Sequence, residues 1–555
     1  MNRTVLLWFV VGWIGFLILP WYVIEDGFWG LEWVLDGYPF DTDYGPAWAH
    51  LLEGEKVWLA PIPLFLLLPL LTRGRIKSDP LYSKILIISG LGGLSYIITQ
   101  GFIVGIAGWE YTSLESLFGP LGQKQYGLGY GAMLVSAAFL FFATQGIAAR
   151  GAVNGDVFVV SSIGFIVAIV GAFIFFPVSQ ILISALQDNE GMYSLGVFLE
   201  KFTDKKIWGL DCLDSTVGCG AAWNSLFLAI TVGATTTALG LVFALVATRS
   251  GFRYRKVLRA LTILPIITPP FVIGLSIILL FGLSGIMTQF FGDVFGIQPT
   301  RWVYGFPGIW IAQMLAYTPI AFLVMIGVVE GISPSMEEAA QTLRADRWKT
   351  FTTVSLPLMR PGLANAFLIG FIESMADFGN PLVLGGNFDV LSTEIFFAIV
   401  GAQNDQGMAA VLAFVLLCFM LTAFYAQRRW LGKKSYTTVT GKGDAGTHAL
   451  LPNRLRWPIY TVAFSWTGFT IVVYCMILFG GFVNIWGLDH TFTFKHYITA
   501  FSVSWTDGGL LWTGAAWDSF WTTISIATIS APLTAAVGLL TAYVLVRQTF
   551  AGKDL

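Results

Sequence analysis

The sequence is poor in charge: only 12% of its 555 residues are Asp, Glu, Lys or Arg, whereas a soluble domain carries about one quarter. This scarcity excludes an ordinary soluble protein. The net charge of −2 offers no sign of the basic surface that nucleic-acid-binding proteins need. Hydrophobic residues make up 56% of the chain, and the mean hydropathy is +0.73. We therefore expect an integral membrane protein that contacts membrane lipid and binds no nucleic acid.

Cysteine and histidine are also scarce, with four of each in the chain. Four cysteines are too few for a scaffold held together by disulfides. The histidines, at positions 50, 448, 490 and 496, form no ligand pattern with cysteines or carboxylates. We therefore expect neither a structural metal site nor a cofactor.

A phosphate-binding loop is missing too. Residues 432–435 read Gly-Lys-Lys-Ser, but the earlier glycine and the Gly-Lys-Ser order of such a loop are absent. We therefore expect no ATPase site and no enzymatic activity in this chain. Any energy from ATP would have to come from a partner.

Long apolar stretches dominate what is present. A bilayer core is about 30 Å thick, and a helix needs about 20 apolar residues to cross it. The sequence therefore predicts an all-α, polytopic membrane protein with about 12 transmembrane helices. The second stretch is short and contains three prolines, and the first is too long for a cleaved signal peptide. The stretches are Val5–Ile24, Val57–Thr72, Ile85–Ala107, Gly127–Ala149, Val157–Ile183, Leu226–Thr248, Leu261–Gly282, Ile309–Val329, Leu363–Leu384, Met408–Ala426, Ile459–Phe482 and Thr522–Val546.

Basic and acidic residues divide between the two sides of the membrane. If Arg3 lies in the cytoplasm and the sides alternate through twelve spans, most of the 31 basic residues fall on the cytoplasmic side, as the positive-inside rule requires. The acidic residues show the opposite bias. We therefore expect a multi-pass protein with a cytoplasmic N-terminus. Cys212 and Cys219 then face the oxidising periplasm, which favours a disulfide between them. The acidic residues of the first outer loop are Glu25, Asp26, Glu32, Asp36, Asp41 and Asp43.

The sequence repeats itself at an offset of 298 residues. Residues 223–252 match residues 521–550 at ten of thirty positions, among them Gly240 with Gly538. Both copies cross the membrane in the same direction, which is typical of a parallel repeat.

The repeat divides the chain into three parts. Residues 1–150 are predicted to form four additional N-terminal helices, residues 151–450 one complete unit, and residues 451–555 the start of a second unit. A polar linker, Gly432–Arg456, connects the two units. At the same offset the loop around Glu338 should recur near position 636, so we expect the second unit to be truncated here or to be completed by another copy.

One predicted cytoplasmic loop, at about residues 330–362, has a distinctive pattern. Ser335, followed three residues later by Glu338, indicates a capping box at the start of a helix. Two alanines in this helix would let another protein approach its backbone closely. Pro357 and Pro361 are expected to break the following helix and redirect the chain into the ninth span. Taken alone, a Glu-Ala-Ala sequence also fits an ordinary helical loop.

The complete string resembles the coupling loop of binding-protein-dependent ABC importer permeases, in which Glu-Ala-Ala is followed by three residues, a glycine and a hydrophobic stretch ending in Leu-Pro. Arg344 departs from the family's glycine, which permits a turn with positive φ, and so puts the local turn in question. The coupling residues that the resemblance implies are Glu337, Glu338, Ala339, Ala340, Arg344, Ala345, Leu356 and Pro357.

The resemblance also implies a fold and partners. The fold would be that of a type I ABC importer permease in a bacterial inner membrane. The loop would dock into a dimer of cytoplasmic ABC ATPase subunits and transmit their closure. A periplasmic solute-binding protein would deliver the substrate.

A second stretch, Glu373–Thr393, resembles the ferric-iron permeases of this family and shares parts with permeases for polyamines, thiamine and sulfate. Glu373 and Asp377 lie one helical turn apart in a predicted span, where an isolated charge costs roughly 2.5–3.5 kcal/mol on insertion scales. Either they belong to a translocation path, with Gly379 and Pro381 interrupting the helix nearby, or they form a structural hydrogen bond between helices.

These features predict an inner-membrane permease subunit, with ferric iron as the favoured substrate and a separate ATPase as the energy source. A permease for a polyamine, thiamine or another small solute is the nearest alternative. An ion-gradient-driven secondary transporter, with Glu373 and Asp377 as coupling groups, is the alternative from another class, and the coupling-loop string argues against it. A membrane scaffold without transport has only the unexplained first four helices in its favour.

Overall fold

The computed structural model of the 555-residue chain describes residues 2–22, 34, 38–39, 44–54, 56–105, 108–109, 111–119, 121, 127–187, 193–213, 218–402, 404–431, 449–486, 488–506, 509–550 and 553. The acidic residues of the first predicted outer loop and residues 432–448 of the predicted linker lie outside these ranges. By its internal contacts the chain divides into two units. One is Met1–Pro177 together with Thr522–Leu555, and the other is Val178–Trp521.

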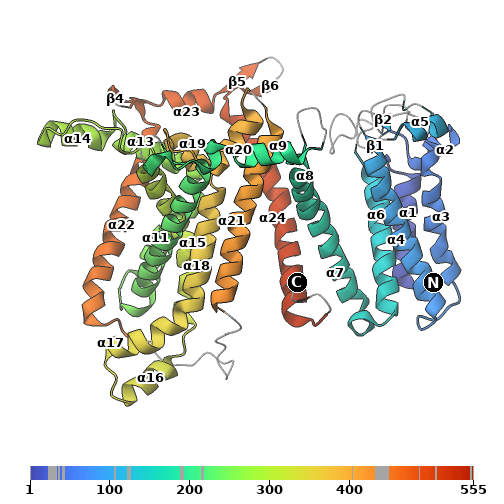
Figure 1. Ribbon diagram of the computed structural model, residues 1–555, viewed down its shortest axis with the longest axis horizontal. Helices are drawn as coiled ribbons and strands as arrows, with labels where there is room; N and C mark the ends of the chain where they lie inside the picture. The colour runs from blue at the N-terminus through green and yellow to red at the C-terminus, as the bar shows by residue number, and fades with distance from the viewer. Residues whose placement is uncertain are drawn as a thin grey trace. The chain divides into compact units, whose positions relative to one another are not determined.

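The first unit consists mainly of helices (Figure 1). Its elements are α1 (Arg3–Leu17), α2 (Ala47–Leu52), η2 (Val57–Leu59), α3 (Pro61–Leu67), η3 (Leu68–Thr72), α4 (Pro80–Ile103), β1 (Val104–Gly105), β2 (Gly108–Trp109), α5 (Thr112–Phe118), α6 (Tyr130–Ala149), η4 (Ala152–Gly155), α7 (Val157–Val170), η5 (Gly171–Phe175) and most of α24 (Ala516–Arg547). Helix α8 (Phe176–Ser184) crosses the boundary between the units.

Close packing of α4 on α6 forms the centre of this unit. A Cβ atom added at Gly90 of α4 would lie 2.3 Å from the backbone nitrogen of Ala143 on α6, so only glycine fits this contact. Trp8 of α1 stacks on Phe141 of α6, with ring centroids 3.9 Å apart. The predicted second span, rich in proline, forms the successive short helices η2, α3 and η3, because proline lacks the amide needed within a continuous helix.

The second unit contains the longer array of helices. Its elements are α9 (Leu195–Phe202), α10 (Lys205–Trp208), η6 (Asp211–Leu213), α11 (Ala221–Arg249), α12 (Arg255–Ile263), η7 (Leu264–Ile267), α13 (Pro270–Phe281), α14 (Ile286–Phe295), α15 (Phe306–Glu330), α16 (Pro334–Thr342), α17 (Arg347–Thr350), η8 (Phe351–Ser355), α18 (Leu356–Ala376), α19 (Gly379–Leu384), α20 (Leu391–Val400), α21 (Gln406–Leu431), α22 (Asn453–Gly480), β3 (Val483–Ile485), β4 (Asp489–Phe492), α23 (Lys495–Ala500), β5 (Val503–Thr506) and β6 (Gly509–Trp512).

Helix α11 forms the core of the second unit by packing on both α15 and α18 (Figure 1). A Cβ atom at Gly240 of α11 would lie 2.8 Å from the backbone carbon of Ala321 on α15. The backbones of the two helices therefore approach each other as closely as in other small-residue contacts between membrane helices. One face of α11 is held by α15 in this way, and α18 covers another.

Ten helices in the described ranges are long and apolar enough to cross a membrane. They overlap the third to twelfth predicted spans, although the ninth, predicted at Leu363–Leu384, lies at Arg347–Ala376. The first two predicted spans fall on the shorter apolar helices Arg3–Leu17 and Val57–Thr72. The prediction of an all-α, polytopic fold is therefore confirmed. The predicted span at 261–282 is shifted: prolines separate α12, η7 and α13, and the membrane-length segment is Pro270–Phe295.

Candidate functional site

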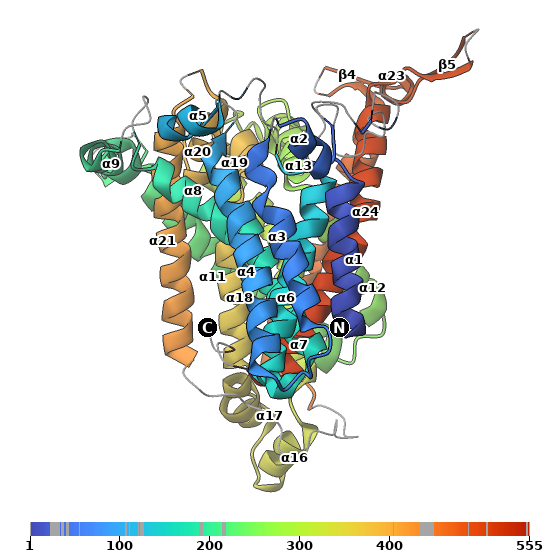
Figure 2. The ribbon, with the colours of Figure 1, turned by 90° about the vertical axis from the view of Figure 1, so that its right-hand side faces the viewer.

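The predicted coupling loop protrudes from one end of the second unit. Helices α16 and α17 lie beyond the ends of the long helices in both views (Figures 1 and 2). Helix α16 begins at Pro334 with Ser333 as its N-cap, so the predicted capping box at Ser335 is wrong. Proline at the first helical position already has the φ that a helix needs, and it places Ser335 inside the first turn.

Arg344 adopts the backbone conformation that glycine would favour. Its φ is +62°, in the left-handed region. The Arg344 amide donates to Gln341 O at 2.9 Å, and the Ala345 amide donates to Ala340 O at 3.1 Å. These bonds close the end of α16 as a left-handed C-cap does. The turn expected from glycine therefore forms with arginine, at the steric cost of a non-glycine residue in this region.

The two prolines after the loop do not break the helix, contrary to prediction. Residues Arg347–Ala376 form one membrane-length helical segment, with the π-helical turn η8 at Phe351–Ser355 and Pro357 in the first turn of α18. The π-helical turn directly precedes Pro357, which has no backbone amide to donate to the preceding turn. The hydrogen-bond pattern of the helix changes there without a break in the helix. The chain changes direction earlier, between α16 and α17.

Most of α16 is exposed. Pro334 and Glu337 are its buried residues, whereas Glu338 and Ala339 are exposed and Ala340 is partly buried. Apolar side chains are also exposed around the tip of the loop: Leu343 is 84% exposed and Met336 is 47% exposed. Exposed apolar groups grouped at the tip of a protruding loop are typical of a surface that binds a partner.

Glu337 is at the base of the loop and forms a buried ion pair with Arg249, the last residue of α11. The side chains of Glu337 and Arg249 are only 1% and 2% exposed. Ser355 Oγ donates to Glu337 Oε1 at 2.5 Å, and the Ala449 amide donates to Glu337 Oε2 at 2.9 Å. Burial alone would raise the pKa of Glu337, but the hydrogen bond and charge of Arg249, with Ser355 and Ala449, hold the pKa below its usual value.

Sequence reasoning included Glu337 in the loop but missed its partner. Arg249 stands 88 residues earlier in the chain, at the end of a predicted span. Its match to Arg547 across the 298-residue offset was the available signal that this arginine has a specific role.

The polar residues predicted inside the membrane meet at the end of α18. Asp377 is 7% exposed and caps the helix with an extended backbone, so it does not continue the helical face of Glu373 as predicted. Gln313 Nε2 of α15 donates to Asp377 Oδ2 at 2.9 Å, and Asn380 Nδ2 donates to the same oxygen at 2.7 Å. The interruption therefore falls at Asp377, before Gly379, and Pro381 is buried within α19.

Asp377 also connects two further segments. The Asn380 amide donates to Asp377 Oδ1 at 3.2 Å, and Ser392 Oγ of α20 donates to the Asp377 carbonyl at 2.7 Å. Glu373, by contrast, is only partly buried. The arrangement shows Asp377 as a hydrogen-bonding junction between α15, α18, α19 and α20. The bonds of Asp377 fit the alternative of a structural hydrogen bond between helices. A role of Glu373 in the translocation path stays a prediction.

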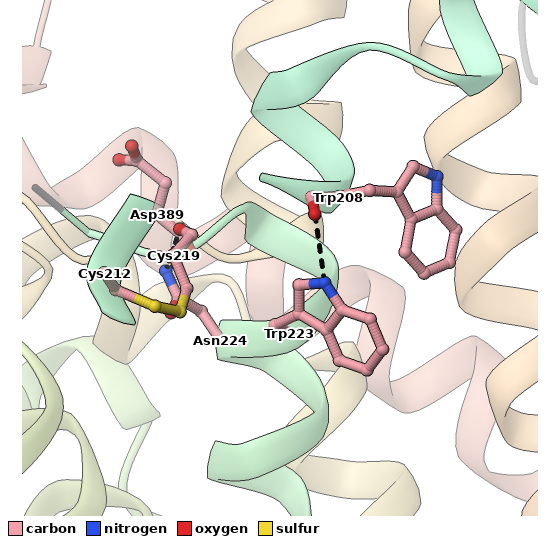
Figure 3. The surroundings of a disulfide bond; sticks show 6 residues. All are labelled: Trp208, Cys212, Cys219, Trp223, Asn224 and Asp389. Carbon is pink, nitrogen blue, oxygen red and sulfur yellow. Dashed lines mark hydrogen bonds between the residues drawn. A yellow bond between two sulfur atoms is a disulfide. The ribbon is translucent and has the colours of Figure 1, made fainter. Parts of the chain in front are cut away.

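A disulfide joins Cys212 and Cys219 (Figure 3) just before the start of α11, whose other end carries Arg249, the partner of Glu337 on α16. Beside it, Asn224 Nδ2 donates to Cys219 O and to Asp389 O, both at 2.9 Å. Trp223 Nε1 donates to Trp208 O at 3.1 Å (Figure 3). The disulfide loop is thus held against the start of α11 and the segment before α20.

A cavity of about 280 Å³ lies at the same end, between α10, α20 and α21, with Lys206, Glu394 and Asp405 in its lining. Asp405 is paired with Lys201 at 2.6 Å. Burial alone would raise the pKa of Asp405, but this pair and the Met408 amide hold it below its usual value. Across the described ranges, no group of three or more His, Cys, Asp or Glu side chains is arranged to hold a metal ion.

Comparison with known proteins gives a consistent result. Residues 237–432 match the family described as binding-protein-dependent transport system inner membrane component. The chain is 40% identical over 444 residues to the "Putative ferric transport system permease protein FbpB 1" of Haemophilus influenzae, covering 80% of this chain and 67% of that protein. It is 36% identical over 546 residues to the ferric transport system permease protein FbpB of Actinobacillus pleuropneumoniae, covering 98% of this chain and 72% of the relative.

More distant similarity is shorter. The sulfate transport system permease protein CysT of Escherichia coli is 33% identical over 193 residues, 34% of this chain and 67% of that protein. Among solved structures, a bacterial ABC transporter involved in the import of alginate matches with a TM-score of 0.40 and 19% identity, over 47% of this chain and 92% of that one. The matched family region contains α16, Arg249 and Asp377.

Proposed function

Since the chain belongs to the binding-protein-dependent ABC permease family, in its ferric transport branch, we propose that it passes ferric iron across the inner membrane. The iron would be delivered by a periplasmic binding protein. A dimer of separate cytoplasmic ATPase subunits would supply the energy. The family prediction made from the loop sequence is confirmed by these relatives.

The observation that carries the coupling part of the proposal is the exposed tip of the α16 loop. Leu343 and Met336 are exposed apolar side chains on a segment that projects past the membrane-length helices (Figure 2). Ala339 is small and exposed beside them, which allows close approach of a partner's backbone. We infer that Glu338, Ala339, Ala340 and Leu343 form the surface that docks into the ATPase.

The orientation follows from the same assignment. With the N-terminus in the cytoplasm, α16 and α17 lie on the cytoplasmic side, where the basic residues concentrate. The Cys212–Cys219 disulfide then lies on the periplasmic side, which is the compartment that maintains disulfides. The binding protein would deliver its cargo at that end.

The assignment of ferric iron depends on the long relatives. The two long relatives described above carry ferric transport in their names, whereas the sulfate permease matches only 34% of the chain. The proposal includes the predicted division of the chain into four additional helices (1–150), a first permease unit (151–450) and the start of a second (451–555).

The proposal also places Glu373 and Asp377 beside the translocation path.

The test is uptake of labelled ferric iron by cells that lack this gene, with and without complementation by the gene. We expect uptake to be lost in the deletion strain and restored by complementation. Labelled sulfate uptake serves as the control and should not change. Unchanged iron uptake together with lost uptake of a polyamine, thiamine or sulfate would contradict the iron assignment while preserving the permease assignment.

A further inference from the structure

Helix α16 has little to hold it apart from one charged residue. Of its nine residues, Pro334 and Glu337 are buried, and most of the others are exposed. An amphipathic helix is ordinarily anchored by several apolar side chains. Here Glu337, with its side chain 1% exposed, takes that place. The position of the helix therefore depends on the bonds that this carboxylate makes.

Those bonds reach three different parts of the second unit. Glu337 Oε1 accepts from Arg249 at the end of α11 and from Ser355 Oγ in the π-helical turn before α18. Glu337 Oε2 accepts from the Ala449 amide, just before α22. Both oxygens are thus used, and each of the three donors comes from a different segment. A buried carboxylate retains its charge only when it is paired and hydrogen-bonded in this way.

Arg249 reinforces the same junction from the other side. Its backbone carbonyl accepts from the Leu451 amide at 3.0 Å, and its Nη2 donates to Val329 O near the end of α15 at 3.4 Å. The Leu451 side chain is 3% exposed and belongs to the same buried cluster as Ile332 and Phe351. The segment leading into α22 is therefore fixed against the base of the loop by both its backbone and its side chain.

We propose that Glu337 is a positioning residue that makes α16 move as one body with α11, α18 and α22. Its role differs from that of the exposed docking residues, because its side chain is buried and acts through Arg249, Ser355 and the backbone at Ala449. In the 298-residue repeat, α22 corresponds to α7 and α8 and so begins the predicted second unit. A movement of α16 is therefore passed to the predicted first permease unit (151–450) and to the leading helix of the predicted second permease unit (451–555).

The chain offers a matched control for this proposal. Arg259 of α12 and Glu330 of α15 form another ion pair near the same loop, at 2.5 Å, but their side chains are 37% and 48% exposed. An exposed pair contributes little to positioning, because solvent screens it. Glu330→Gln removes a carboxylate charge from the same region without touching the junction around Glu337.

The test measures the rigidity of the junction directly. Spin labels are placed at Gln341→Cys on α16 and Trp457→Cys on α22, both exposed positions outside the proposed docking surface. The free cysteines Cys418 and Cys475 are replaced by serine. The distance distribution is compared for the full chain, bound to its ATPase in lipid nanodiscs, with and without Glu337→Gln. We expect a narrow distribution that Glu337→Gln broadens and Glu330→Gln leaves unchanged.

Glu337→Gln leaves Arg249 buried without its carboxylate partner, which could prevent folding. A second variant keeps the test valid in that case. Arg249→Met combined with Glu337→Met leaves no unpaired charge and preserves much of the side-chain volume. We expect it to insert at the wild-type level and to broaden the distribution as Glu337→Gln does. In both variants, the amount of substrate transported per ATP hydrolysed should fall roughly twofold to thirtyfold, the range of effects found along coupled networks.

The proposal rests on the proposed function for its ATPase partner and for its transport readout. If the wild-type protein moves no ferric iron, the proposed substrate fails, whereas the spin-label comparison still decides the role of Glu337. A narrow distribution and unchanged transport per ATP in both variants would overturn the positioning role. So would a loss of folded protein with unchanged transport per ATP in the molecules that remain, which is the result of a purely structural role.

Discussion

Gln313 of α15 and Ser374 of α18 form a reciprocal connection at Asp377. Ser374 Oγ donates to Gln313 Oε1 at 2.6 Å, and Gln313 Nε2 donates to Asp377 Oδ2 at 2.9 Å. Gln313 is fully buried and Ser374 is 4% exposed. Polar groups buried in a membrane protein are retained where their hydrogen bonds are satisfied. The connection therefore fixes the end of α18 relative to α15, where the chain turns into α19.

The first prediction concerns Asp377. We expect Asp377→Leu to reduce uptake strongly, because it leaves Gln313 Nε2 and Asn380 Nδ2 without their acceptor, at about 1–3 kcal/mol for each unsatisfied group. Asp377→Asn retains an acceptor oxygen and should reduce uptake less. Leu382→Ala, in the neighbouring helix α19, is the apolar control and should have a smaller effect than Asp377→Leu. Uptake is measured per molecule of inserted protein.

A variant at Glu373 tests the translocation path separately from the hydrogen bonds of Asp377. None of the described hydrogen bonds of Asp377 involves the Glu373 side chain. If Glu373 lies beside the translocation path, Glu373→Leu should reduce uptake with no loss of inserted protein. Unchanged uptake after apolar replacement at both positions 373 and 377 would disprove the path role and the importance of the junction together.

The second prediction tests the docking surface of α16. Ala339→Trp or Glu338→Lys should leave the amount of inserted protein unchanged, because both side chains are exposed and contribute little to stability. The bulk or the reversed charge should nevertheless prevent close docking of the ATPase. We expect lower uptake and weaker co-purification of the ATPase subunit. Wild-type uptake by both variants would show that this loop is not the coupling element.

The third prediction concerns the turn at Arg344. Because its φ is +62°, Arg344→Gly should stabilise the C-terminal turn of α16 by about 1 kcal/mol, the order of the penalty for a non-glycine residue in the left-handed region. Arg344→Val should destabilise it, since β-branched residues tolerate this conformation least. Hydrogen exchange at residues 340–346 measures the effect. Slower exchange in the valine variant than in the glycine variant would contradict the assigned backbone conformation.

The sequence predicted the membrane-length helices well, because lipid imposes a hydropathy signal that each span shows by itself. It could not predict the π-helical turn at Phe351–Ser355 or the end of α18 at Asp377. Both depend on partners outside the local window, such as Gln313. The short helix Leu391–Val400 was also missed, because ten residues fall well short of a span.

The functional residues show the same division. The Glu-Ala-Ala string identified the loop because its pattern lies within a few consecutive residues. The partner of Glu337 was not predictable from the loop, since Arg249 belongs to another helix and a hydrophobic pattern says nothing about which charges meet. The turn at Arg344 was in question because arginine disfavours a positive φ. Backbone hydrogen bonds to Gln341 O and Ala340 O maintain that conformation, and residue preference alone does not reveal them.

The last prediction tests the repeat through a matched pair of glycines, Gly240 of α11 and Gly538 of α24. A Cβ at Gly240 would lie 2.8 Å from the backbone of α15, so Gly240→Val should force α11 and α15 apart and reduce the amount of folded protein. At Gly538, no heavy atom in the described part of the chain lies within 4 Å of the corresponding Cβ position. If α24 has no partner helix equivalent to α15, Gly538→Val should be tolerated.

Folded protein is measured by size-exclusion chromatography after extraction in mild detergent, with both variants expressed in the same cells. Equal losses for Gly240→Val and Gly538→Val would show that α24 is packed by another helix as α11 is by α15, which is the result that the repeat predicts for a completed second unit. Loss for Gly240→Val alone would show that α24 has no closely packed partner helix in the protein tested. Tolerance of both would contradict the close contact of α11 with α15, because a valine side chain cannot be accommodated at a backbone separation that small.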